Sequence, residues 1–374
     1  MGRPLEGLLV LSLEQAVAAP LCSARLADAG ARVIKIERAE GDFARFYDGA
    51  VGGLSSYFVW LSRGKESLVA DIKDPNDAEL IESIIERADV FIQNLAPGAA
   101  ARAGLGSEAL RARHPRLITV DISGYGESGA YAGMKAYDLL VQAESGLAMI
   151  TGNAAGPGRV GVSVCDIACG MSTYAAVLEA LIERGRTGRG MALKASLFDA
   201  IADWMNVPLL QYEGSGRAPE RVGLEHPTIC PYGAFTTRDG AQVVIAIQNE
   251  REWLEFCRCF LEEPEFACRP ELQSNVGRVA NRVAVDSQVA AAVARLTRAE
   301  AAAKLRASNT AFGFVNDLRG LSEHAALRRI EVGTPFGNAS IAAPPVIDSD
   351  GPRVFGQVPA IGQHSHAIRA EFGR

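Results

Sequence analysis

Hydrophobic and polar positions alternate regularly along the first third of the chain. Short apolar runs predict buried strands at residues 8–13, 32–37, 67–72, 90–93 and 117–122. Segments with a helical stripe of apolar residues lie between them, at 20–30, 74–88 and 107–113. Strands that alternate with helices form parallel sheets covered on both faces. The pattern therefore predicts a large α/β domain of Rossmann-like type with a mostly parallel sheet.

The pattern changes in the second half of the chain. A helix is predicted at 137–150, a long helix with the 3.6-residue period at 166–184, and a strand followed by a helix at 191–205. Residues 211–225 are rich in glycine and charge, which favours a linker. A hairpin at 232–247 and alanine-rich helices over 250–307 predict a second, smaller α+β domain at 226–320.

Composition agrees with a folded protein of this organisation. The chain has 374 residues, of which 48% are hydrophobic and 22% are charged, and such a length suggests about two domains. The net charge of −6 provides no general cationic surplus for nucleic-acid binding. The N-terminal apolar run is short for a signal peptide, and no run reaches the ~20 apolar residues of a membrane span. We therefore expect a cytoplasmic protein.

Several familiar motifs are absent or incomplete. The seven cysteines are scattered without a CxxC pair, which predicts buried free thiols and no metal site. Residues 124–129 (GYGESG) match a dinucleotide-binding pattern by their letters, but no helix opens directly from these glycines. The G-x-S-x-G elbow of hydrolases is missing, and His364 and His366 are interpreted as part of a solvated tail. We expect no tightly bound cofactor.

One carboxylate lies at a position of chemical interest. Asp166 stands where an irregular segment containing Gly and Ser meets the long apolar helix. Its side chain could simply cap that helix, since aspartate is common at the N-cap. Alternatively, the amides and the dipole of the helix end keep the carboxylate ionised and available as a nucleophile. The residues alone leave both interpretations open.

A series of motifs in fixed order makes the sequence specific. They are PLEGLLVLSLEQAVAAP (4–20), LADAGARVIKIERAEGDFAR (26–45), LSRGKESLVADIK (61–73), ADVFIQNLAPGAAARAGLG (88–106), TGRGMALKASLFDA (187–200) and VPAIGQHS (358–365). In these motifs, and over essentially its whole length, the chain resembles the family III CoA-transferases of the CaiB/BaiF type. The resemblance implies one large CoA-binding domain built from 1–210 and 325–374, and a homodimer of two interlocked, ring-like subunits.

The resemblance also implies a reaction. The family's catalytic aspartate corresponds to Asp166, which would attack a donor acyl-CoA and form an aspartyl anhydride and then an aspartyl-CoA thioester. The related 2-methylacyl-CoA racemases share this fold but use a histidine where this chain has Tyr137. A CoA-binding protein without catalysis is the third alternative. Of the three, CoA transfer is the interpretation that the motifs favour.

The family's CoA site can be carried over by position. The corresponding residues are Val17, Ala18, Arg38, Ala70, Asp71, Ile72, Lys73, Asn94, Leu95, Ala96, Arg102, Lys135, Ala136, Tyr137 and Asp138. Four of them are cations, which suit an anionic nucleotide. Position 17 departs from formyl-CoA transferase, which has glutamine there.

The substrate acids are less well defined by the resemblance. Segment 223–235 lacks the glycine-rich loop that shields the intermediates of formyl-CoA transferase. The departure points to larger acids such as itaconate, mesaconate or malate, with succinyl-CoA as the donor. His226 and Tyr232 could then contact the acyl chain, or they could simply pack at the entrance of the hairpin.

Overall fold

The computed structural model describes residues 3–347 and 353–373, and it divides the chain into two compact units. We call them the large unit and the small unit. The large unit comprises Met1–Ala148, Arg159–Leu210 and Arg328–Arg374, and the small unit comprises Met149–Gly158 and Gln211–Leu327. The chain thus leaves the large unit twice and returns to it twice.

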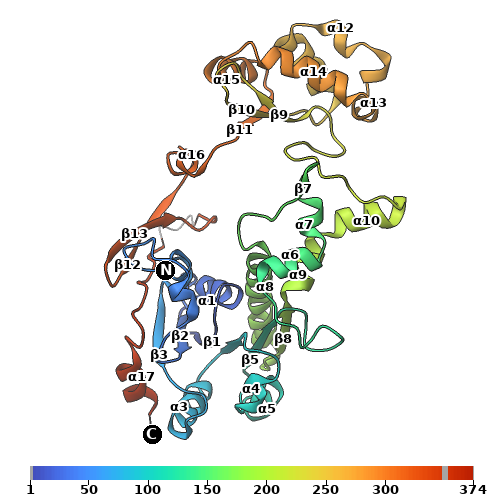
Figure 1. Ribbon diagram of the computed structural model, residues 1–374. Coiled ribbons are helices and arrows are strands. Elements are labelled where there is room, and N and C mark those ends of the chain that lie inside the picture. The colour runs from blue at the N-terminus through green and yellow to red at the C-terminus, as the bar shows by residue number, and fades with distance from the viewer. Residues whose placement is uncertain (1–2, 348–352, 374) are drawn as a thin grey trace. The chain divides into compact units, whose positions relative to one another are not determined.

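A six-stranded parallel sheet is the centre of the large unit (Figure 1). Its order is β3-β2-β1-β4-β5-β8, and the strands are β1 (Leu9–Leu13), β2 (Arg32–Glu37), β3 (Lys65–Val69), β4 (Val90–Gln93), β5 (Ile118–Ser123) and β8 (Ala192–Ser196). The predicted α/β fold with a mostly parallel sheet is confirmed. The direction of strand succession reverses between β1 and β4, which is the topological switch point of such a sheet.

The third strand differs from its prediction at 67–72. It begins at Lys65 and ends at Val69, where the pairing with β2 ends at the pair Glu37–Val69. One further backbone hydrogen bond, from the Ala70 amide to the Glu37 carbonyl at 3.0 Å, follows this pair. After Val69 the chain turns toward α3 (Pro75–Ile85). Asp74 accepts hydrogen bonds from the amides of Asn76 and Asp77 and so caps this helix.

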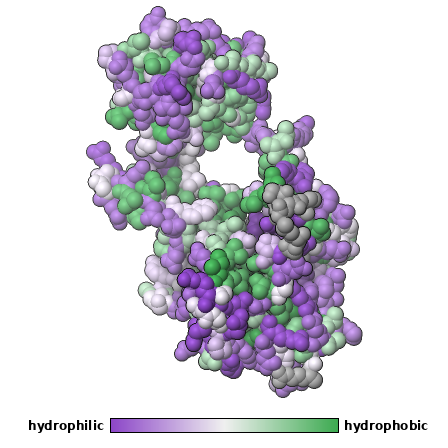
Figure 2. Space-filling view, turned by 180° about the vertical axis from the view of Figure 1, so that it is seen from behind, coloured by the Kyte–Doolittle hydropathy of each residue, from purple (hydrophilic) through white to green (hydrophobic). Residues whose placement is uncertain are grey.

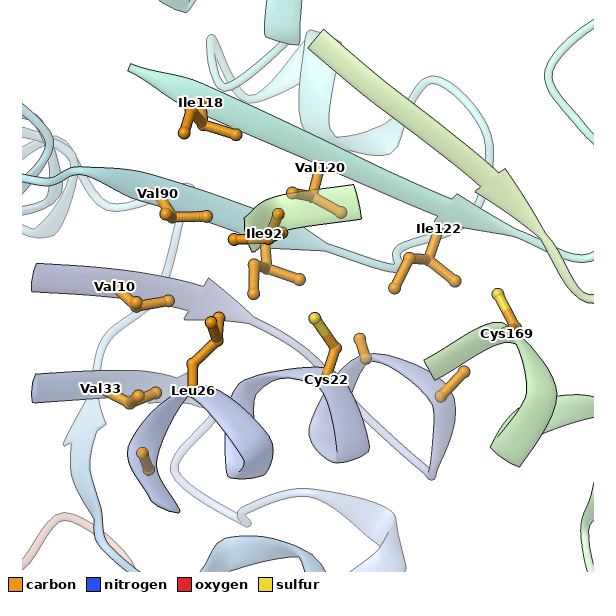
Figure 3. Close-up of a cluster of buried hydrophobic side chains, with 14 of the residues drawn as sticks. Val10, Cys22, Leu26, Val33, Val90, Ile92, Ile118, Val120, Ile122 and Cys169 are labelled. Atoms are coloured by element: carbon orange, nitrogen blue, oxygen red, sulfur yellow. The ribbon is translucent and has the colours of Figure 1, made fainter. Parts of the chain in front are cut away.

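Helices cover both faces of the sheet. One face packs against α1 (Ala18–Asp28), α6 (Asp138–Glu144), α8 (Val164–Thr187) and α9 (Leu197–Trp204). The other packs against α3, α4 (Ala99–Arg102), α5 (Ser107–Arg113) and α17 (Ser365–Phe372). Figure 3 shows Cys22 and Leu26 of α1 lying over Val10 and Ile92 of the strands. Because side chains alternate along a strand, β1, β2 and β4 supply apolar residues to both layers, as Val10 and Leu11 of β1 illustrate.

Helix α8 is long and apolar enough, by length and composition, to cross a membrane. It packs against α1 and α9, however, and its residues Cys165, Cys169 and Val177 belong to the apolar cluster between helices and sheet. We therefore describe it as a core helix. All seven cysteines are free thiols as predicted, although Cys259 is only half-buried and Cys268 is exposed.

The rest of the large unit surrounds the sheet. It contains a short 3-10 helix, η1 (Phe43–Phe46), the helix α2 (Ser56–Ser62), and the hairpin β12 (Arg329–Thr334) and β13 (Gly337–Ala342). The short helix α7 (Leu147–Ile150) spans the boundary between the two units. After β13 the chain returns along the edge strand β3. There, His364 Nδ1 accepts the amide of Ser67 at 3.1 Å and Ser365 Oγ accepts the amide of Val69 at 3.0 Å. The solvated tail expected around His364 is therefore wrong, because these side chains satisfy the open edge of the sheet.

The small unit has its own core. Three antiparallel strands in the order β11-β10-β9 pack against helices, with Trp253, Phe256 and Val289 buried between them. Its elements are β9 (Tyr232–Thr236), β10 (Gln242–Ala246), α11 (Glu250–Phe256), the π-helical turn η2 (Cys257–Leu261), α12 (Pro264–Ala267), η3 (Pro270–Leu272), α13 (Asn275–Ala280), α14 (Arg282–Val293), α15 (Arg298–Ala307), β11 (Ala311–Phe314) and α16 (Leu318–Ser322). This is the α+β composition that the sequence predicted.

The segment 211–225, expected to be a linker, is partly helical. Its first residues complete α10 (Asn206–Ser215). Farther along, the guanidinium of Arg221 donates to the carbonyl oxygens of Asn153 (3.1 Å) and Met149 (3.2 Å). These contacts tie the segment to the small ladder formed by β6 (Gly152–Asn153) and β7 (Gly156–Pro157).

Candidate active site

The residues expected to bind CoA follow the carboxyl ends of neighbouring strands. Val17 and Ala18 follow β1, Arg38 follows β2, residues 70–73 follow β3, and residues 94–96 follow β4. In a parallel sheet these ends lie along one edge, and ligands bind there near the switch point. The fold thus brings residues from four separate motifs to one edge of the large unit.

The four expected phosphate-binding cations share one property. Arg38, Lys73, Arg102 and Lys135 are exposed, and their side chains form no ion pair within residues 3–347 and 353–373. Arg45, by contrast, forms two hydrogen bonds to Glu37, at 2.8 and 2.7 Å. The four exposed cations are therefore available to an anionic ligand, whereas Arg45 is already paired.

Two other expected contacts are engaged within the protein. The Asn94 side chain accepts the amide of Gln15 at 2.9 Å and donates to the Gln15 carbonyl at 2.8 Å. Asp71 accepts the amide of Lys73 at 2.9 Å. Both side chains therefore shape the loops that carry them. Ala70 is buried, Leu95 is half-buried and Ala96 is exposed.

A hollow of about 250 Å³ lies beside the β3–α3 loop. Ile72, one of the residues expected to bind CoA, lines it, together with Ala103 and Leu105, which follow Arg102 in the chain. Glu82 and Arg113 form the polar part of the wall and are paired at 2.9 Å. The hollow thus combines apolar side chains with one ion pair, and Ile72 is the expected CoA contact that lines it.

Asp166 lies at the third position of helix α8. The N-cap of that helix is Ser163, so the interpretation of Asp166 as a capping residue is wrong. The first-turn amides are instead bound from α6, where Asp138 Oδ1 accepts the amides of Cys165 at 2.8 Å and Asp166 at 3.4 Å. Asp138 is buried and also accepts the side-chain amide of Gln142 at 2.7 Å. Helix α6 therefore holds the start of α8.

This arrangement changes the electrostatics expected for Asp166. Burial and, after it, the charge of Asp138 raise the pKa of Asp166 to about 7. The expectation that helix amides keep Asp166 ionised must be corrected, because Asp138 occupies those amides. A partly desolvated carboxylate that titrates near neutral pH is a common feature of catalytic sites.

The motif-based prediction missed an aromatic group beside Asp166. Tyr47 contacts Phe43 and Tyr57, with ring centres 5.7 and 5.3 Å apart. Burial and the nearby charges of Asp42 and Asp166 raise the pKa of Tyr47 to about 12. The dense aromatic run FARFY (43–47), which lies between the second and third strands, was the available signal. These rings place apolar surface and phenol groups close to the carboxylate.

A close helix contact joins the Asp166 region to the first strand–helix turn. A Cβ at Gly170, one turn after Asp166, would lie 2.6 Å from the carbonyl oxygen of Ala18. Only glycine permits this approach without a shift of backbone. Ile167 packs in the same apolar cluster as Val17. The expected nucleophile and the expected first CoA contact thus lie on adjoining helix ends.

The remaining expected contacts belong to different parts of the chain. Lys135, half-buried Ala136 and exposed Tyr137 directly precede α6. His226 and Tyr232 lie in the small unit, where their rings stack with centres 5.2 Å apart. The segment that carries them is well anchored, since Arg282 donates to the His226 carbonyl at 2.7 Å and Asn275 to the Thr228 carbonyl at 2.8 Å. Among the described residues, no group of three or more His, Cys, Asp or Glu side chains could hold a metal ion.

Comparison with known proteins decides the family. The model of CoA-transferase family III matches residues 5–365. The chain belongs to this family. It is 34% identical to an acetyl-CoA:oxalate CoA-transferase from Acetobacter aceti, over 99% of this chain and 96% of the relative. It is also 32% identical to a succinyl-CoA:glutarate CoA-transferase from Mus musculus, over 99% and 86% of the two chains.

Solved structures agree. A CaiB/BaiF family protein from Brucella suis matches with a TM-score of 0.86 and 31% identity, over 100% of both chains. The protein is therefore a family III CoA-transferase, an enzyme that moves CoA between an acyl-CoA and a carboxylate. Of the three functions that the sequence left open, CoA transfer is the one the comparisons support.

Proposed function

We propose that this enzyme transfers CoA from succinyl-CoA to a small dicarboxylate, with Asp166 as the covalent nucleophile. The proposal depends chiefly on the partly buried Asp166, whose carboxylate stands at a helix start beside the edge where the CoA-binding loops meet. The names of both relatives described above specify dicarboxylate acceptors, oxalate and glutarate. Itaconate, mesaconate and malate are the acceptors that the bulky segment 223–235 suggests.

The proposed reaction has four balanced steps. The Asp166 carboxylate attacks the thioester carbonyl of the donor, forming a mixed anhydride and releasing CoA thiolate. The thiolate then attacks the aspartyl carbonyl, which gives aspartyl-CoA thioester and releases the donor acid. The acceptor carboxylate attacks this thioester, forming a new anhydride and again freeing the thiolate. Attack of the thiolate on the acyl carbon finally yields the new acyl-CoA and restores Asp166.

The surrounding residues have separate roles in this scheme. Arg38, Lys73 and Arg102 bind the phosphates of CoA as unpaired cations. Asp138 positions the start of α8 by accepting its amides. Its negative charge also destabilises the ionised carboxylate of Asp166 before the donor has bound. The phenol of Tyr47 offers a hydrogen-bond donor for the second carboxylate of an acceptor.

Trapping of the intermediate tests the proposal. The protein is incubated with succinyl-CoA and hydroxylamine, and the adduct is mapped by peptide mass spectrometry. We expect a hydroxamate on Asp166 only, no adduct in Asp166→Ala, and a normal adduct in Asp203→Ala, which changes an exposed carboxylate of α9. An adduct elsewhere, or full activity of Asp166→Ala, would contradict the assignment. A panel of acids with succinyl-CoA then identifies the acceptor.

We also propose that the enzyme acts as an interlocked homodimer in a reducing, cytoplasmic compartment. Apolar side chains reach the surface in several places (Figure 2). Trp204, Val207 and Leu210 are more than half exposed, at 56%, 64% and 64%. Such side chains favour burial against a second subunit. The seven free thiols support the proposed reducing compartment, because cysteines remain unpaired there.

A further inference from the structure

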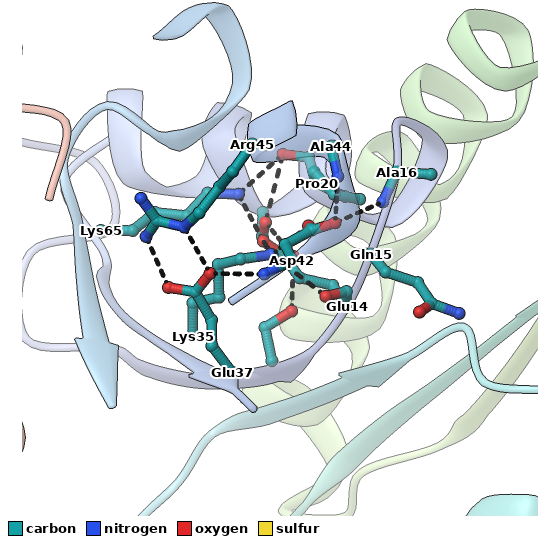
Figure 4. A network of polar contacts seen from close by, with 12 residues as sticks. Glu14, Gln15, Ala16, Pro20, Lys35, Glu37, Asp42, Ala44, Arg45 and Lys65 are labelled. Atoms are coloured by element: carbon teal, nitrogen blue, oxygen red, sulfur yellow. Dashed lines mark hydrogen bonds and ion pairs between the residues drawn. The ribbon is translucent and has the colours of Figure 1, made fainter. Parts of the chain in front are cut away.

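Four charged side chains form a buried cluster beneath the first strand–helix turn, and the proposed reaction uses none of them. They are Glu14, Lys35, Asp42 and Lys65, which we call the buried ion cluster (Figure 4). Glu14 accepts Lys65 at 2.6 Å and lies 3.5 Å from Lys35, which donates to Asp42 at 2.8 Å. Side-chain exposure is 2% for Asp42 and 0% for the other three.

The cluster is balanced and fully engaged. Two ammonium groups face two carboxylates, and Ser12 and Ser23 donate to the second oxygen of Glu14. Burial opposes the ionisation of Glu14, but Lys65 and Lys35 outweigh it and lower the pKa of Glu14 to about 2. Buried ion pairs often contribute little net stability compared with an apolar core. Fixing the local geometry is an alternative role for such a cluster.

The cluster binds the backbone of the turn from residue 14 to residue 20. Lys35 donates to the carbonyl of Glu14 at 3.0 Å, and Asp42 accepts the amide of Ala16 at 3.3 Å. Lys65 donates to the carbonyl of Pro20, in the first turn of α1, at 2.9 Å. The side chain of Asn94 also accepts the amide of Gln15 and donates to its carbonyl, so side chains satisfy the backbone groups from the Glu14 carbonyl to the Ala16 amide.

The turn has a conformation that needs such support. Ala16 has φ of 65°, in the left-handed region where residues other than glycine are strained. Strain of this kind persists only where the surroundings determine it, and it concentrates at functional sites. The next two residues are Val17 and Ala18, the expected first contacts of CoA, and Ala18 also meets α8 at Gly170.

We propose that the buried ion cluster is a positioning device for the CoA thioester: it holds the turn at Ala16 so that the start of α1 presents its backbone to the ligand beside Asp166. The inference rests on the proposed function, because it assumes that CoA binds along this edge. It assigns Lys35, Asp42 and Lys65, which stand in the family-like motifs at 26–45 and 61–73, to positioning rather than to contact with substrate.

A matched pair of double variants tests the inference. Glu14→Gln/Lys65→Met removes one cation and one anion of the cluster, so no buried charge loses its only partner. Asp28→Asn/Arg63→Met removes an equally buried ion pair of the large unit that does not touch the turn, with side-chain exposures of 5% and 2%. Melting temperature, the Kd for free CoA by calorimetry, and kcat and KM for succinyl-CoA are measured for both and for the native protein.

The two variants should differ in ligand binding and not in stability. We expect the Kd for CoA and the KM to rise about tenfold in the cluster variant and to change less than about threefold in the control, with similar melting temperatures. Hydrogen exchange at residues 14–20 should be faster only in the cluster variant. If that variant does not fold, Ser23→Ala, which keeps all four charges, should raise the Kd about twofold.

The outcomes separate this inference from the proposed function. If native protein binds CoA and transfers it while the cluster variant binds as tightly, the inference is wrong and the function stands. Equal loss of affinity in the control would also overturn it, since general destabilisation would then explain the effect. If native protein binds no CoA at all, both fail.

Discussion

At the scale of single residues, the environment of Asp166 explains most of its chemistry. A carboxylate at a helix start is usually stabilised by free amides, but here Asp138 accepts them. Asp166 consequently stays close to a like charge in a partly dehydrated place, and its pKa rises to about 7. A poorly stabilised carboxylate is a better nucleophile toward a thioester, provided that it is ionised.

The first prediction concerns the pH dependence of the initial acylation. Below pH 7 the ionised fraction of Asp166 should fall about tenfold per unit, so the rate of CoA release should rise with pH and level off above about 7. Asp138→Asn removes the neighbouring charge but keeps an oxygen for the Cys165 amide, so its rate profile should shift to lower pH. Stopped-flow thiol detection measures both profiles, and an unshifted profile would show that the Asp138 charge does not reach Asp166.

The second prediction concerns stability. Because its pKa is raised from 3.8 to about 7, Asp166 stays protonated to a higher pH in the folded state than in the unfolded state. The free energy of unfolding therefore falls as the pH rises through this window. Asp166→Asn should therefore raise the free energy of unfolding at pH 8 by up to roughly 4 kcal/mol and have little effect near pH 4. Urea titrations at the two pH values measure the difference; an equal effect at both would refute the electrostatic cause.

At the scale of helices and strands, close contacts between elements hold the site together. Helix α8 approaches α1 through Gly170, and the C-terminal segment closes the edge of the sheet through His364 and Ser365. Neither contact is visible in the hydrophobic pattern, which predicts the elements but not how closely they approach. Each can be tested by a small substitution.

Two alanine substitutions within α8 should have opposite effects. Gly170→Ala places a Cβ 2.6 Å from the Ala18 carbonyl and should lower the free energy of unfolding by roughly 1–3 kcal/mol, with loss of activity. Gly185→Ala, whose Cβ meets nothing within 4 Å, should raise it by about 0.5–1 kcal/mol. Chemical denaturation compares them, and a neutral Gly170→Ala would show that the helices separate easily.

The tail contact gives a prediction of its own. His364→Ala removes the acceptor of the Ser67 amide, and Ser67 is fully buried. The free energy of unfolding should therefore fall by about 1–2 kcal/mol. His364→Asn offers an oxygen at the position of Nδ1 and should restore part of this loss. Thermal unfolding of the three proteins decides; similar losses in both variants would argue that ring packing, not the hydrogen bond, matters.

At the scale of the whole molecule, the proposed homodimer is the main expectation. Light scattering of the purified protein at micromolar concentration should give about twice the 39.7 kDa of one chain. Charged substitutions at Val207 and Leu210, both strongly exposed, should weaken the dimer, whereas a substitution at exposed Arg189 should not. A mass of one chain for the native protein would contradict the proposal.

The net charge of −6 also has a different meaning at this scale. Within residues 3–347 and 353–373, Arg38, Lys73, Arg102 and Lys135 are exposed cations that form no ion pair. By contrast, the side chains of Lys35, Arg45, Arg63 and Lys65 are held in buried ion pairs. The sum over the sequence could not separate these two groups, because burial and pairing depend on residues far apart in the chain. Lys65, for example, meets Glu14 across 51 positions.

The sequence by itself determined the order of strands and helices, the α/β class and the family, because hydrophobic periodicity and motif order are local properties. It also singled out Asp166. Only the tertiary structure decided which group caps α8, which cations are free, and what holds the first turn. These depend on contacts between distant segments, where Asp138 reaches Cys165 and Asp42 reaches Ala16, and on the dehydration that packing imposes.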